Sequence, residues 1–448
     1  MSWQSPAGNR QQPPSATREP MRLLHTSDWH LGQSLHNFER SYEHQCFLDW
    51  LLATIVSEQA DALLIAGDIF DNANPSSASQ KQLYRFLQQA RQAAPQLDLI
   101  IIAGNHDSPG RLEAPGPLLE AHGIRVIGNM LRDAHGDIDI ERLVLPLTNN
   151  SGTVEAWCIA MPFLRPGDVP RVAAQADSGP DSGSTANQSP DPYLAGIALL
   201  YAQALALALS RRTSGQAIVA MGHCHMVGAE ISNDSERRIV IGGSEMLSAG
   251  IFDPAIAYAA LGHLHLAQKV GSREHIRYCG SPIPLSFAEV GYRHQILRVD
   301  LDGGSVVATL ALPVPRAVEL LRVPKRPAPL PDVLAALAAL PALETLPASH
   351  ALEMHQLPLL EVRVLLDAPE PGLRTRIEQA LAGKAVRLAK IETSSKVFER
   401  SVAAELTLDQ LDQLQPDDIF KRLYLQKFGS AAPLDQLNAF TELMLPDA

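Results

Sequence analysis

The chain has 448 residues, a formal net charge of −12 and a hydrophobic content of 46%. This length allows two or three domains with a substantial core. Its four cysteines lie far apart, with no Cys-x-x-Cys spacing, which favours free thiols in the reducing cytoplasm over the disulfide framework of a small secreted protein.

The first twenty residues are polar and rich in proline, glutamine and serine. They have neither the apolar core nor the cleavage pattern of a signal peptide. We therefore expect residues 1–20 to form a disordered leader, with a true translation start at Met21 as the alternative.

Five short apolar runs, each ending in a glycine or a polar turn, have the pattern of buried parallel strands. They are Arg22 to His25, Ala62 to Ala66, Leu99 to Ala103, Ala217 to Ala220 and Ala257 to Leu261. The pattern predicts an α/β fold with a sheet covered on both faces. Loops at the carboxyl ends of such strands would gather the polar residues that follow each run.

Helices are expected at Tyr42 to Glu58 and Ser79 to Ala93, where apolar faces would either mediate a homodimer or pack on the sheet. Residues 171–192 are rich in Ser, Gly, Asp and Pro and predict a flexible insertion. The apolar stretch Leu194 to Ser210 includes Gln203 and is short for a membrane span, so we expect a packed helix and no membrane association.

A second domain is expected over residues 316–400. Val323 to Pro331 contains four prolines and predicts a stiff linker. The runs that follow predict a small α+β unit, with a helix at Asp332 to Ala339, a strand at Leu359 to Leu366, a helix at Gly372 to Leu381 and a strand at Val386 to Glu392.

The tail, residues 401–448, contains two amphipathic patterns, Asp417 to Phe428 and Leu434 to Leu445. Too little chain remains to bury their apolar faces. They are expected to form a pair of helices that binds a partner, with packing on the preceding domain as the alternative.

Acidic and imidazole side chains follow the five apolar runs. The segments are Thr26 to His30, Gly67 to Asp71, Gly104 to Asp107, Gly222 to His225 and Gly262 to His265. Their oxygen and nitrogen donors, without a thiolate, suit Mn²⁺, Fe²⁺ or Zn²⁺ in a catalytic site better than a closed structural zinc. Because residues two apart in extended backbone point to one side, Asp28 with His30, and His263 with His265, would each clamp a metal.

In this order the segments resemble the calcineurin-like metallophosphoesterase superfamily, with its Asp-x-His, Gly-Asp, Gly-Asn-His-Asp, Gly-His and Gly-His-x-His motifs. The resemblance implies a β-sandwich flanked by helices over residues 21–315 that binds two divalent ions. Asp68 would bridge the ions, which turn water into a nucleophile near neutral pH. One ion would bind Asp28, His30, Asp68 and His265, and the other Asp68, Asn105, His223 and His263.

The surroundings of the motifs narrow the resemblance to the bacterial SbcD nucleases. Phosphoprotein phosphatases of the superfamily have an arginine where Asn72 follows Asp71, whereas Ser27 to Gly32 and Tyr278 to Phe287 resemble SbcD. This implies a Mn²⁺-dependent DNA exonuclease and endonuclease that acts at ends and hairpins in DNA repair, recombination and replication. The resemblance also implies an SbcC-type ATPase as partner. The chain has no Gly-x4-Gly-Lys-Ser/Thr motif, so we do not expect it to hydrolyse ATP itself.

Several residues keep more than one expected role. The resemblance places His106 as the acid that protonates the leaving oxygen or stabilises charge on the phosphorane. Asp107 would orient His106 or make a loop hydrogen bond. Asp71 would be a positioning or DNA-contacting residue, or the N-cap of the next helix. His225 imitates the second half of a clamp, although the family's ligand is at His223.

The acidic charge is unfavourable for binding DNA, which depends on Lys and Arg neutralising phosphates. Affinity would come from local patches, dimerisation or a partner, with Arg111 and Arg165 as candidate contacts. In SbcD-like proteins the α+β unit caps the nuclease and the tail binds the SbcC coiled coil, so Lys384, Arg387 and Lys390 would face DNA or form a solvated edge. A small-molecule or cyclic-nucleotide phosphodiesterase, and a noncatalytic DNA-end scaffold, are the competing hypotheses.

Overall fold

The computed structural model describes residues 20–170, 191–230, 246–345, 353–368 and 370–395, with Phe420, Lys421, Tyr424, Pro433, Gln436 and Leu437 in the tail. It divides into two compact units, Met1–Glu319 and Leu320–Ala448. The expected leader, insertion and C-terminal helices fall almost wholly outside the described residues.

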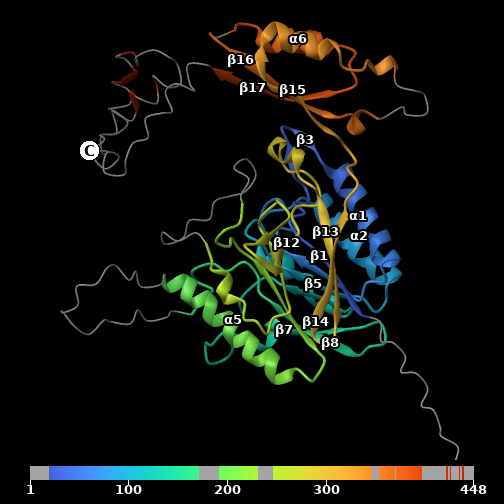
Figure 1. Ribbon diagram of the computed structural model, residues 1–448, viewed down its shortest axis with the longest axis vertical. Coiled ribbons are helices and arrows are strands. Elements are labelled where there is room, and N and C mark those ends of the chain that lie inside the picture. The colour runs from blue at the N-terminus through green and yellow to red at the C-terminus, as the bar shows by residue number, and fades with distance from the viewer. Residues whose placement is uncertain are drawn as a thin grey trace, which may run out of the picture. The chain divides into compact units, whose positions relative to one another are not determined.

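The N-terminal unit is built on two six-stranded sheets (Figure 1). The first has the order β14-β13-β1-β4-β5-β6 and the second the order β11-β12-β10-β9-β8-β7. Strands of the first sheet are β1 (Met21–Thr26), β4 (Ala62–Ala66), β5 (Asp98–Ile102), β6 (Ile124–Ile127), β13 (Gln295–Asp302) and β14 (Ser305–Pro313). Strands of the second are β7 (Val144–Thr148), β8 (Val154–Ala160), β9 (Ala217–His223), β10 (Tyr258–Gly262), β11 (Gln268–Val270) and β12 (Arg273–Tyr278).

The expected α/β class is confirmed, but the five apolar runs do not share one sheet. β1, β4 and β5 are parallel neighbours in the first sheet, and β9 and β10 are parallel neighbours in the second. The apolar pattern reports burial on both faces, and a strand between two layers has that pattern in either sheet. Apolar runs therefore predict where the strands are, but not to which of the two sheets each strand belongs.

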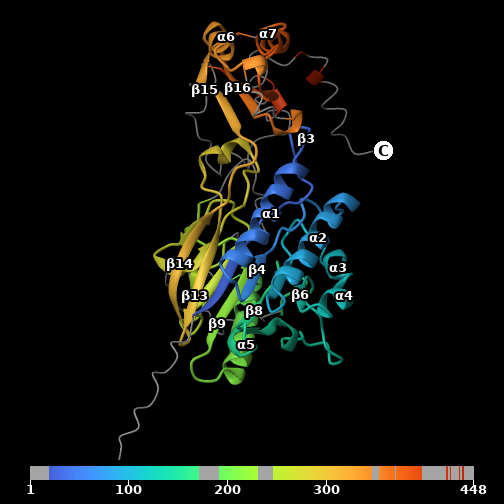
Figure 2. The ribbon, with the colours of Figure 1, turned by 90° about the vertical axis from the view of Figure 1, so that its right-hand side faces the viewer.

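Alternating side chains of the first sheet enter two different cores. Leu23 and Leu64 belong to the core shared with the second sheet, whereas Leu24, Leu63 and Ile65 belong to the core under the helices. That outer face is covered by α1 (Ser41–Ser57) and α2 (Ser77–Ala93) (Figure 2). Short helices α3 (Pro109–Glu113) and α4 (Gly116–Glu120) and a hairpin of β2 (Ser34–Leu35) and β3 (Phe38–Glu39) complete this side.

The apolar faces of α1 and α2 pack on the sheet, one of the two roles left open for them. Phe47, Leu51 and Ile55 of α1 are at most 1% exposed and share a core with Leu83 and Leu87 of α2. These faces are therefore not available to a second copy of the chain.

The predicted packed helix is α5 (Pro192–Arg211), which lies beside β7 and β8. By length and composition alone it could cross a membrane. Leu200, Tyr201 and Ala204 are at most 2% exposed and belong to the core of the sandwich. This face therefore packs within the unit.

Over residues 320–395, as far as the structure describes them, the C-terminal unit contains a three-stranded parallel sheet and two α-helices. Its elements are β15 (Leu320–Pro329), α6 (Leu330–Ala338), β16 (Leu359–Leu366), α7 (Leu373–Ala380) and β17 (Arg387–Ser395). Val333, Leu337, Val362, Val364 and Ile377 form its core. The predicted helices and strands over residues 332–392 all occur, within three residues of the expected bounds.

The stiff linker expected at Val323 to Pro331 was wrong, because most of this segment is strand β15. β15 is an edge strand whose pairing with β16 shifts register between Val323 and Ala328, across Pro324 and Pro327. Proline cannot donate to a ladder but is tolerated at sheet edges and bulges. The high proline content thus predicted a linker, whereas the segment forms an irregular edge strand.

Replacing Leu51 by alanine should destabilise the N-terminal unit by about 2–5 kcal/mol, because a fully buried side chain leaves a cavity between α1 and the sheet. Urea denaturation followed by circular dichroism measures this loss. Val56→Ala, in the same helix but at a side chain 50% exposed, is the control and should change stability by less than about 0.5 kcal/mol. Equal effects of the two would contradict the packing of α1 on the sheet.

Candidate metal centre

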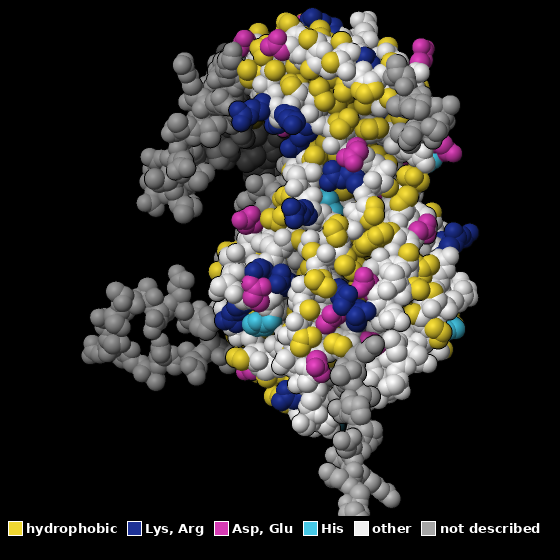
Figure 3. Space-filling view, turned by 45° about the vertical axis from the view of Figure 1, so that its right-hand side comes forward, with side chains coloured by type: hydrophobic (Ala, Val, Ile, Leu, Met, Phe, Trp, Pro, Cys, Tyr) yellow, Lys and Arg dark blue, Asp and Glu magenta, His cyan; other side chains and the backbone are white. Residues whose placement is uncertain are grey.

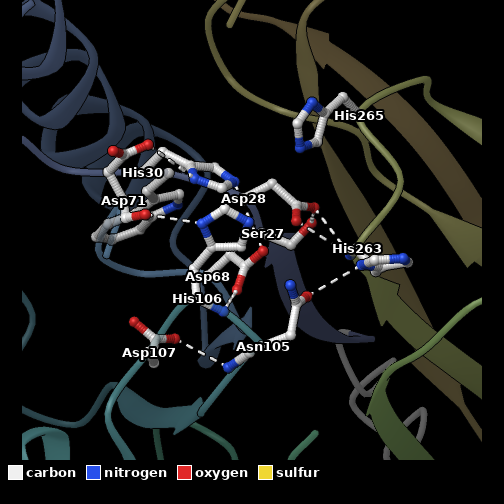
Figure 4. A network of polar contacts seen from close by, with 12 residues as sticks. Ser27, Asp28, His30, Asp68, Asp71, Asn105, His106, Asp107, His263 and His265 are labelled. Atoms are coloured by element: carbon white, nitrogen blue, oxygen red, sulfur yellow. Dashed lines mark hydrogen bonds and ion pairs between the residues drawn. The ribbon is translucent and has the colours of Figure 1, made fainter. Parts of the chain in front are cut away.

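Loops from both sheets meet at the carboxyl ends of their strands. The backbone N–H of His263, after β10, donates to Asp28 Oδ1 (3.0 Å), after β1. His223 Nδ1, at the end of β9, lies 2.8 Å from the carbonyl oxygen of Ala66, at the end of β4. These bonds join the two sheets where the predicted ligand segments emerge, so residues far apart in sequence lie together (Figure 4).

The gathered side chains form groups that could hold metal ions. Asp28, His30 and His265 make one group, and Asp68, His223 and His263 make another, with the donor atoms of each group within 4.8 Å of one another. Asn105 Oδ1 is 2.9 Å from His223 Nε2 and 3.1 Å from His263 Nδ1, which places it in the second group. All seven predicted ligands are thus brought into one site.

Asp68, a member of the second group, also approaches the first. Its Oδ2 is 3.6 Å from His30 Nε2 in the first group and 3.4 Å from His223 Nε2 in the second. A carboxylate has enough lone pairs to serve both sides at once. Asp68 therefore approaches donors of both groups, and its role as a bridging ligand stays a prediction.

The donor set fits divalent cations. Asp28, Asp68 and the four histidines of the groups are at most 4% exposed, and buried carboxylates require compensating positive charge. His30 Nε2 is buried and has no hydrogen-bond partner among the described residues. Metal ions at these groups would supply both the charge and the missing partner.

The donors do not converge through extended backbone, as the clamp argument assumed. Asp28, His30 and Asp68 have φ of 55°, 48° and 49°, and His263 has φ of 105°. These are left-handed values that non-glycine residues rarely adopt. His263 and His265, expected as one clamp, consequently belong to different groups.

The strained loops are fixed by hydrogen bonds to each other. Asp28 N–H donates to Gly67 O (3.0 Å) and His30 N–H to Asp68 O (3.0 Å), so the first two ligand loops run hydrogen-bonded side by side. Unfavourable backbone of this kind persists only where surrounding bonds determine it, as at functional sites. The loops therefore present their donors in a fixed arrangement.

Glycines of the motifs provide room for the carboxylates and imidazoles. A Cβ added to Gly104 would stand 2.1 Å from Asp68 Oδ1 and 2.3 Å from the Asp68 nitrogen. One added to Gly262 would stand 1.9 Å from Ala66 O and 2.9 Å from His223 Nδ1. Close approach of a neighbouring ligand loop thus explains the glycine at the start of these two motifs.

Asp107 makes loop hydrogen bonds, one of the two roles left open for it. Its carboxylate accepts from the backbone N–H groups of Ile69 (3.1 Å), Phe70 (3.0 Å) and Gly104 (2.9 Å). Burial, with the charge of Asp68, raises the pKa of Asp107 to about 6. Asp107 thus joins the Asp68 loop to its own loop and holds Asp68 in place.

His106 and Asp71 lie beside the first group and, together with His30, form a third group of possible donors. The backbone N–H of His106 donates to Asp68 Oδ1 (2.8 Å). The ring nitrogen Nδ1 of His106 lies 2.7 Å from the carbonyl oxygen of Asp71. The Asp71 carboxylate is 3.5 Å from His30 Nδ1, whereas Ser76 caps α2, so the N-cap role expected for Asp71 was wrong. The ring centroid of His225 is 6.2 Å from that of His263, and His225 belongs to none of the metal groups among the described residues.

The two histidines of the second group differ electrostatically. Burial opposes charge on His223, but Asp68 outweighs it and raises the pKa of His223 to about 9. Burial and the charge of His223 hold the pKa of His263 well below its ordinary value. Because imidazole must be neutral to ligate, an ion at this group would displace the His223 proton.

Sequence reasoning missed Glu289, Phe163 and the partners of Ser27. Glu289 Oε1 is 2.9 Å from His265 Nδ1, and the Ser27 hydroxyl donates to Asp28 while lying 3.0 Å from Cys279 Sγ. The ring of Phe163 meets His223 edge-on, with centroids 6.3 Å apart. The one sequence signal near these residues is the unusual run Tyr278 to Phe287. It includes Cys279 but neither Glu289 nor Phe163.

Comparison with known proteins identifies the family. Residues 21–267 match the calcineurin-like phosphoesterase family, and residues 316–428 match the SbcD C-terminal family, described as type 5 capsule protein repressor C-terminal domain. The SbcD subunit of the nuclease SbcCD from Rhodobacter capsulatus is 38% identical over 386 residues, which cover 86% of this chain and 90% of the relative. The chain belongs to the SbcD family of calcineurin-like phosphoesterases.

Two further relatives are also SbcD subunits of the nuclease SbcCD. The Escherichia coli protein is 38% identical over 305 residues, 67% of this chain and 71% of its own length. The Bacillus subtilis protein is 33% identical over 285 residues, 63% of this chain and 67% of its own length. The predicted family is confirmed, and the chain is a metal-dependent phosphodiesterase that binds divalent ions.

Gly104→Ala should abolish or strongly weaken metal binding, because the new methyl group would displace Asp68 from between the two donor groups. Titration of Mn²⁺ into the chelator-treated protein, followed by calorimetry, measures the loss. The matched control is Gly110→Ala, in α3, where a Cβ meets nothing within 4 Å. If Gly104→Ala binds Mn²⁺ with wild-type affinity, the close approach of Gly104 to Asp68 does not determine the position of Asp68.

Proposed function

We propose that this chain is a DNA nuclease subunit that uses two Mn²⁺ ions to hydrolyse phosphodiesters at DNA ends and hairpins. It would act in the cytoplasm with an SbcC-type ATPase, in DNA repair, recombination and replication. The observation that carries this proposal is Asp68 between two donor groups, in a chain related to SbcD nuclease subunits over most of its length.

The ligand assignment within this proposal follows the two groups. Asp28, His30 and His265 would hold one ion, Asn105, His223 and His263 the other, and Asp68 both. Oxygen and nitrogen donors without a thiolate suit Mn²⁺, although they do not distinguish it from Fe²⁺. When bound, two such ions lower the pKa of water and offset the charge of the phosphodiester.

His106 is the proposed proton donor to the leaving oxygen. Its Nδ1 lies against the Asp71 carbonyl, which can only accept, so this nitrogen carries a proton. A protonated ring would then also carry a proton on Nε2, available to the departing oxygen or to charge on the phosphorane. Its ring stands edge-on to His30 with centroids 4.7 Å apart, beside the first donor group.

His106→Ala should retain both ions and lose most DNA cleavage, because it removes a proton donor without removing a ligand; general acid catalysis contributes roughly 10²–10⁴-fold. Calorimetry of Mn²⁺ binding and a hairpin-cutting assay measure the two effects. Asp68→Ala is the comparison variant and should lose both ions as well as activity. Near-normal cutting by His106→Ala would refute its role, and normal metal stoichiometry in Asp68→Ala would refute the bridge.

The basic residues expected to contact DNA in the C-terminal unit have partners within that unit. The net charge is −12, and Lys and Arg are interspersed with acidic side chains on the face shown in Figure 3. In the C-terminal unit, Lys384 contacts the carbonyls of Ala338 and Leu340 at the end of α6. Arg387 donates to Leu357 O, and Lys390 Nζ is 3.2 Å from Glu361. These three residues thus make contacts within their own unit.

Arg165 is better placed to meet a phosphate near the metals. Its guanidinium stands over the Phe163 ring, 5.4 Å from the centroid, and that ring in turn meets His223. The Phe163 N–H donates to Ala103 O (2.8 Å), immediately before the Gly104 loop. A partly exposed aromatic ring with an arginine over it is a common platform for single-stranded nucleic acid.

A homodimer of the nuclease chain is also part of the proposal. The buried faces of α1 and α2 cannot form it, because they pack on the first sheet. The SbcC-type partner is proposed to bind residues 401–448, as the amphipathic patterns of the tail suggest.

Arg165→Ala should weaken DNA binding and make it less dependent on salt, with a slope of log affinity against log salt smaller by about 1. Hairpin cutting should fall relative to hydrolysis of bis-p-nitrophenyl phosphate, which would bind without extended phosphate contacts. The matched control is Arg211→Ala, whose guanidinium stands over Trp157 at 5.5 Å. An unchanged ratio of the two activities in Arg165→Ala would show that Arg165 does not contact DNA.

The same assays on the wild-type chain test the competing function. Faster hydrolysis of the small substrate or of cyclic nucleotides than of DNA would favour a small-molecule phosphodiesterase.

A further inference from the structure

The segment between β12 and β13 lies against the first donor group. Ser281 N–H donates to the carbonyl oxygen of His265 (3.1 Å), and a Cβ on Gly280 would stand 2.7 Å from the same oxygen. Cys279 meets Ser27, which donates to Asp28. This segment therefore contacts the backbone of His265 directly and reaches Asp28 through Ser27.

Glu289, in the single 3-10 turn Phe287–Gly291 of this segment, is completely buried beside His265. Glu289 Oε1 is 2.9 Å from His265 Nδ1, and Oε2 accepts from the Leu285 N–H at 2.8 Å. Both carboxylate oxygens are thus occupied by donors. The His265 side chain is buried as well, with 3% of the residue exposed.

The pairing determines which nitrogen of His265 can ligate. A carboxylate accepts hydrogen bonds, so His265 Nδ1 must carry the proton. The neutral ring then has its lone pair on Nε2. A carboxylate behind a ligating imidazole fixes its tautomer and orientation and raises its basicity.

The loop before Glu289 is held by Arg40 and Gln33, which lie just before α1. Arg40, 1% exposed at the start of this helix, contacts Glu43 and the carbonyl of Pro284. Gln33 Nε2 donates to Leu285 O (2.8 Å). The loop that supplies Glu289 is thus hydrogen-bonded on both sides of Leu285, so its carboxylate has little freedom to move.

We propose that Glu289 is the positioning residue of His265 and that it sets the affinity of the metal site formed by Asp28, His30 and His265. The inference rests on the proposed function, because it requires metal ions at the two donor groups. It assigns to the segment between β12 and β13 a role in holding metal rather than in contacting DNA.

The test is Glu289→Gln in the full-length, chelator-treated protein, titrated with Mn²⁺ by calorimetry. His265 and Leu285 contact different carboxylate oxygens, so in the glutamine variant the amide oxygen can replace only one of them and the NH2 group faces the other donor. One binding step should weaken by roughly 10–100-fold while the other keeps its affinity. Unchanged affinity for both steps would overturn the proposal.

A double-mutant cycle separates positioning from general destabilisation. His265→Ala should weaken the same step, and adding Glu289→Gln to it should cause no further loss, because the partner is already absent. Additive losses would overturn the positioning role. Glu361→Gln, at another fully buried glutamate in the C-terminal unit, is the matched control and should leave Mn²⁺ binding unchanged.

Two further outcomes are informative. If Glu289→Gln does not fold, Glu289→Asp keeps the charge but is one methylene too short to reach Nδ1, and it should show the same weakened step. Wild-type affinity in the aspartate variant would overturn the proposal. If the wild-type chain cuts DNA with Mn²⁺ but the Glu289 variants bind Mn²⁺ as tightly as the wild type does, this inference alone fails. If the wild type binds no Mn²⁺, the proposed function fails too.

Discussion

Two carboxylates, Asp28 and Asp68, are held in the interior of the sandwich with at most 2% of either residue exposed, and much of the surrounding structure serves to make that burial possible. An isolated buried carboxylate costs several kcal/mol unless hydrogen bonds or cations compensate for it. Backbone N–H groups of His263 and His106 supply part of the compensation. Left-handed backbone at Asp28 and Asp68, and glycine at Gly104, follow from bringing the loops this close.

Three buried imidazoles of the site are each oriented by an oxygen from a different part of the fold. His223 meets the carbonyl of Ala66, His265 meets Glu289, and His30 lies near Asp71. Each of these oxygens contacts Nδ1, which leaves Nε2 of the neutral ring as the nitrogen with a lone pair. The site therefore depends on both sheets, since each of these histidines takes its orienting partner from another segment of the chain.

The sequence predicts the strands and the seven candidate ligand residues from local signals, and the structure brings these seven residues together, while their role as ligands stays a prediction. An apolar run identifies a buried strand, and a motif such as Gly104 to Asp107 keeps its donors within a few residues. The division of strands between two sheets, the contact of Glu289 with His265 and the contact of Phe163 with His223 depend on tertiary neighbours, which a single sequence does not reveal. The left-handed backbone at Asp28 and His30 was missed for another reason, since neither residue type signals positive φ as glycine does.

The prolines of β15 have a consequence for how the C-terminal unit behaves in a crowded solution. β15 is at one end of the three-stranded sheet, and an exposed strand of ten residues would normally offer its N–H groups to any extended chain. Pro324, Pro327 and Pro329 lack those donors, and the register shift interrupts the ladder between Val323 and Ala328. The composition that resembles a linker in the sequence thus removes backbone donors that an extended chain would need to add to this edge.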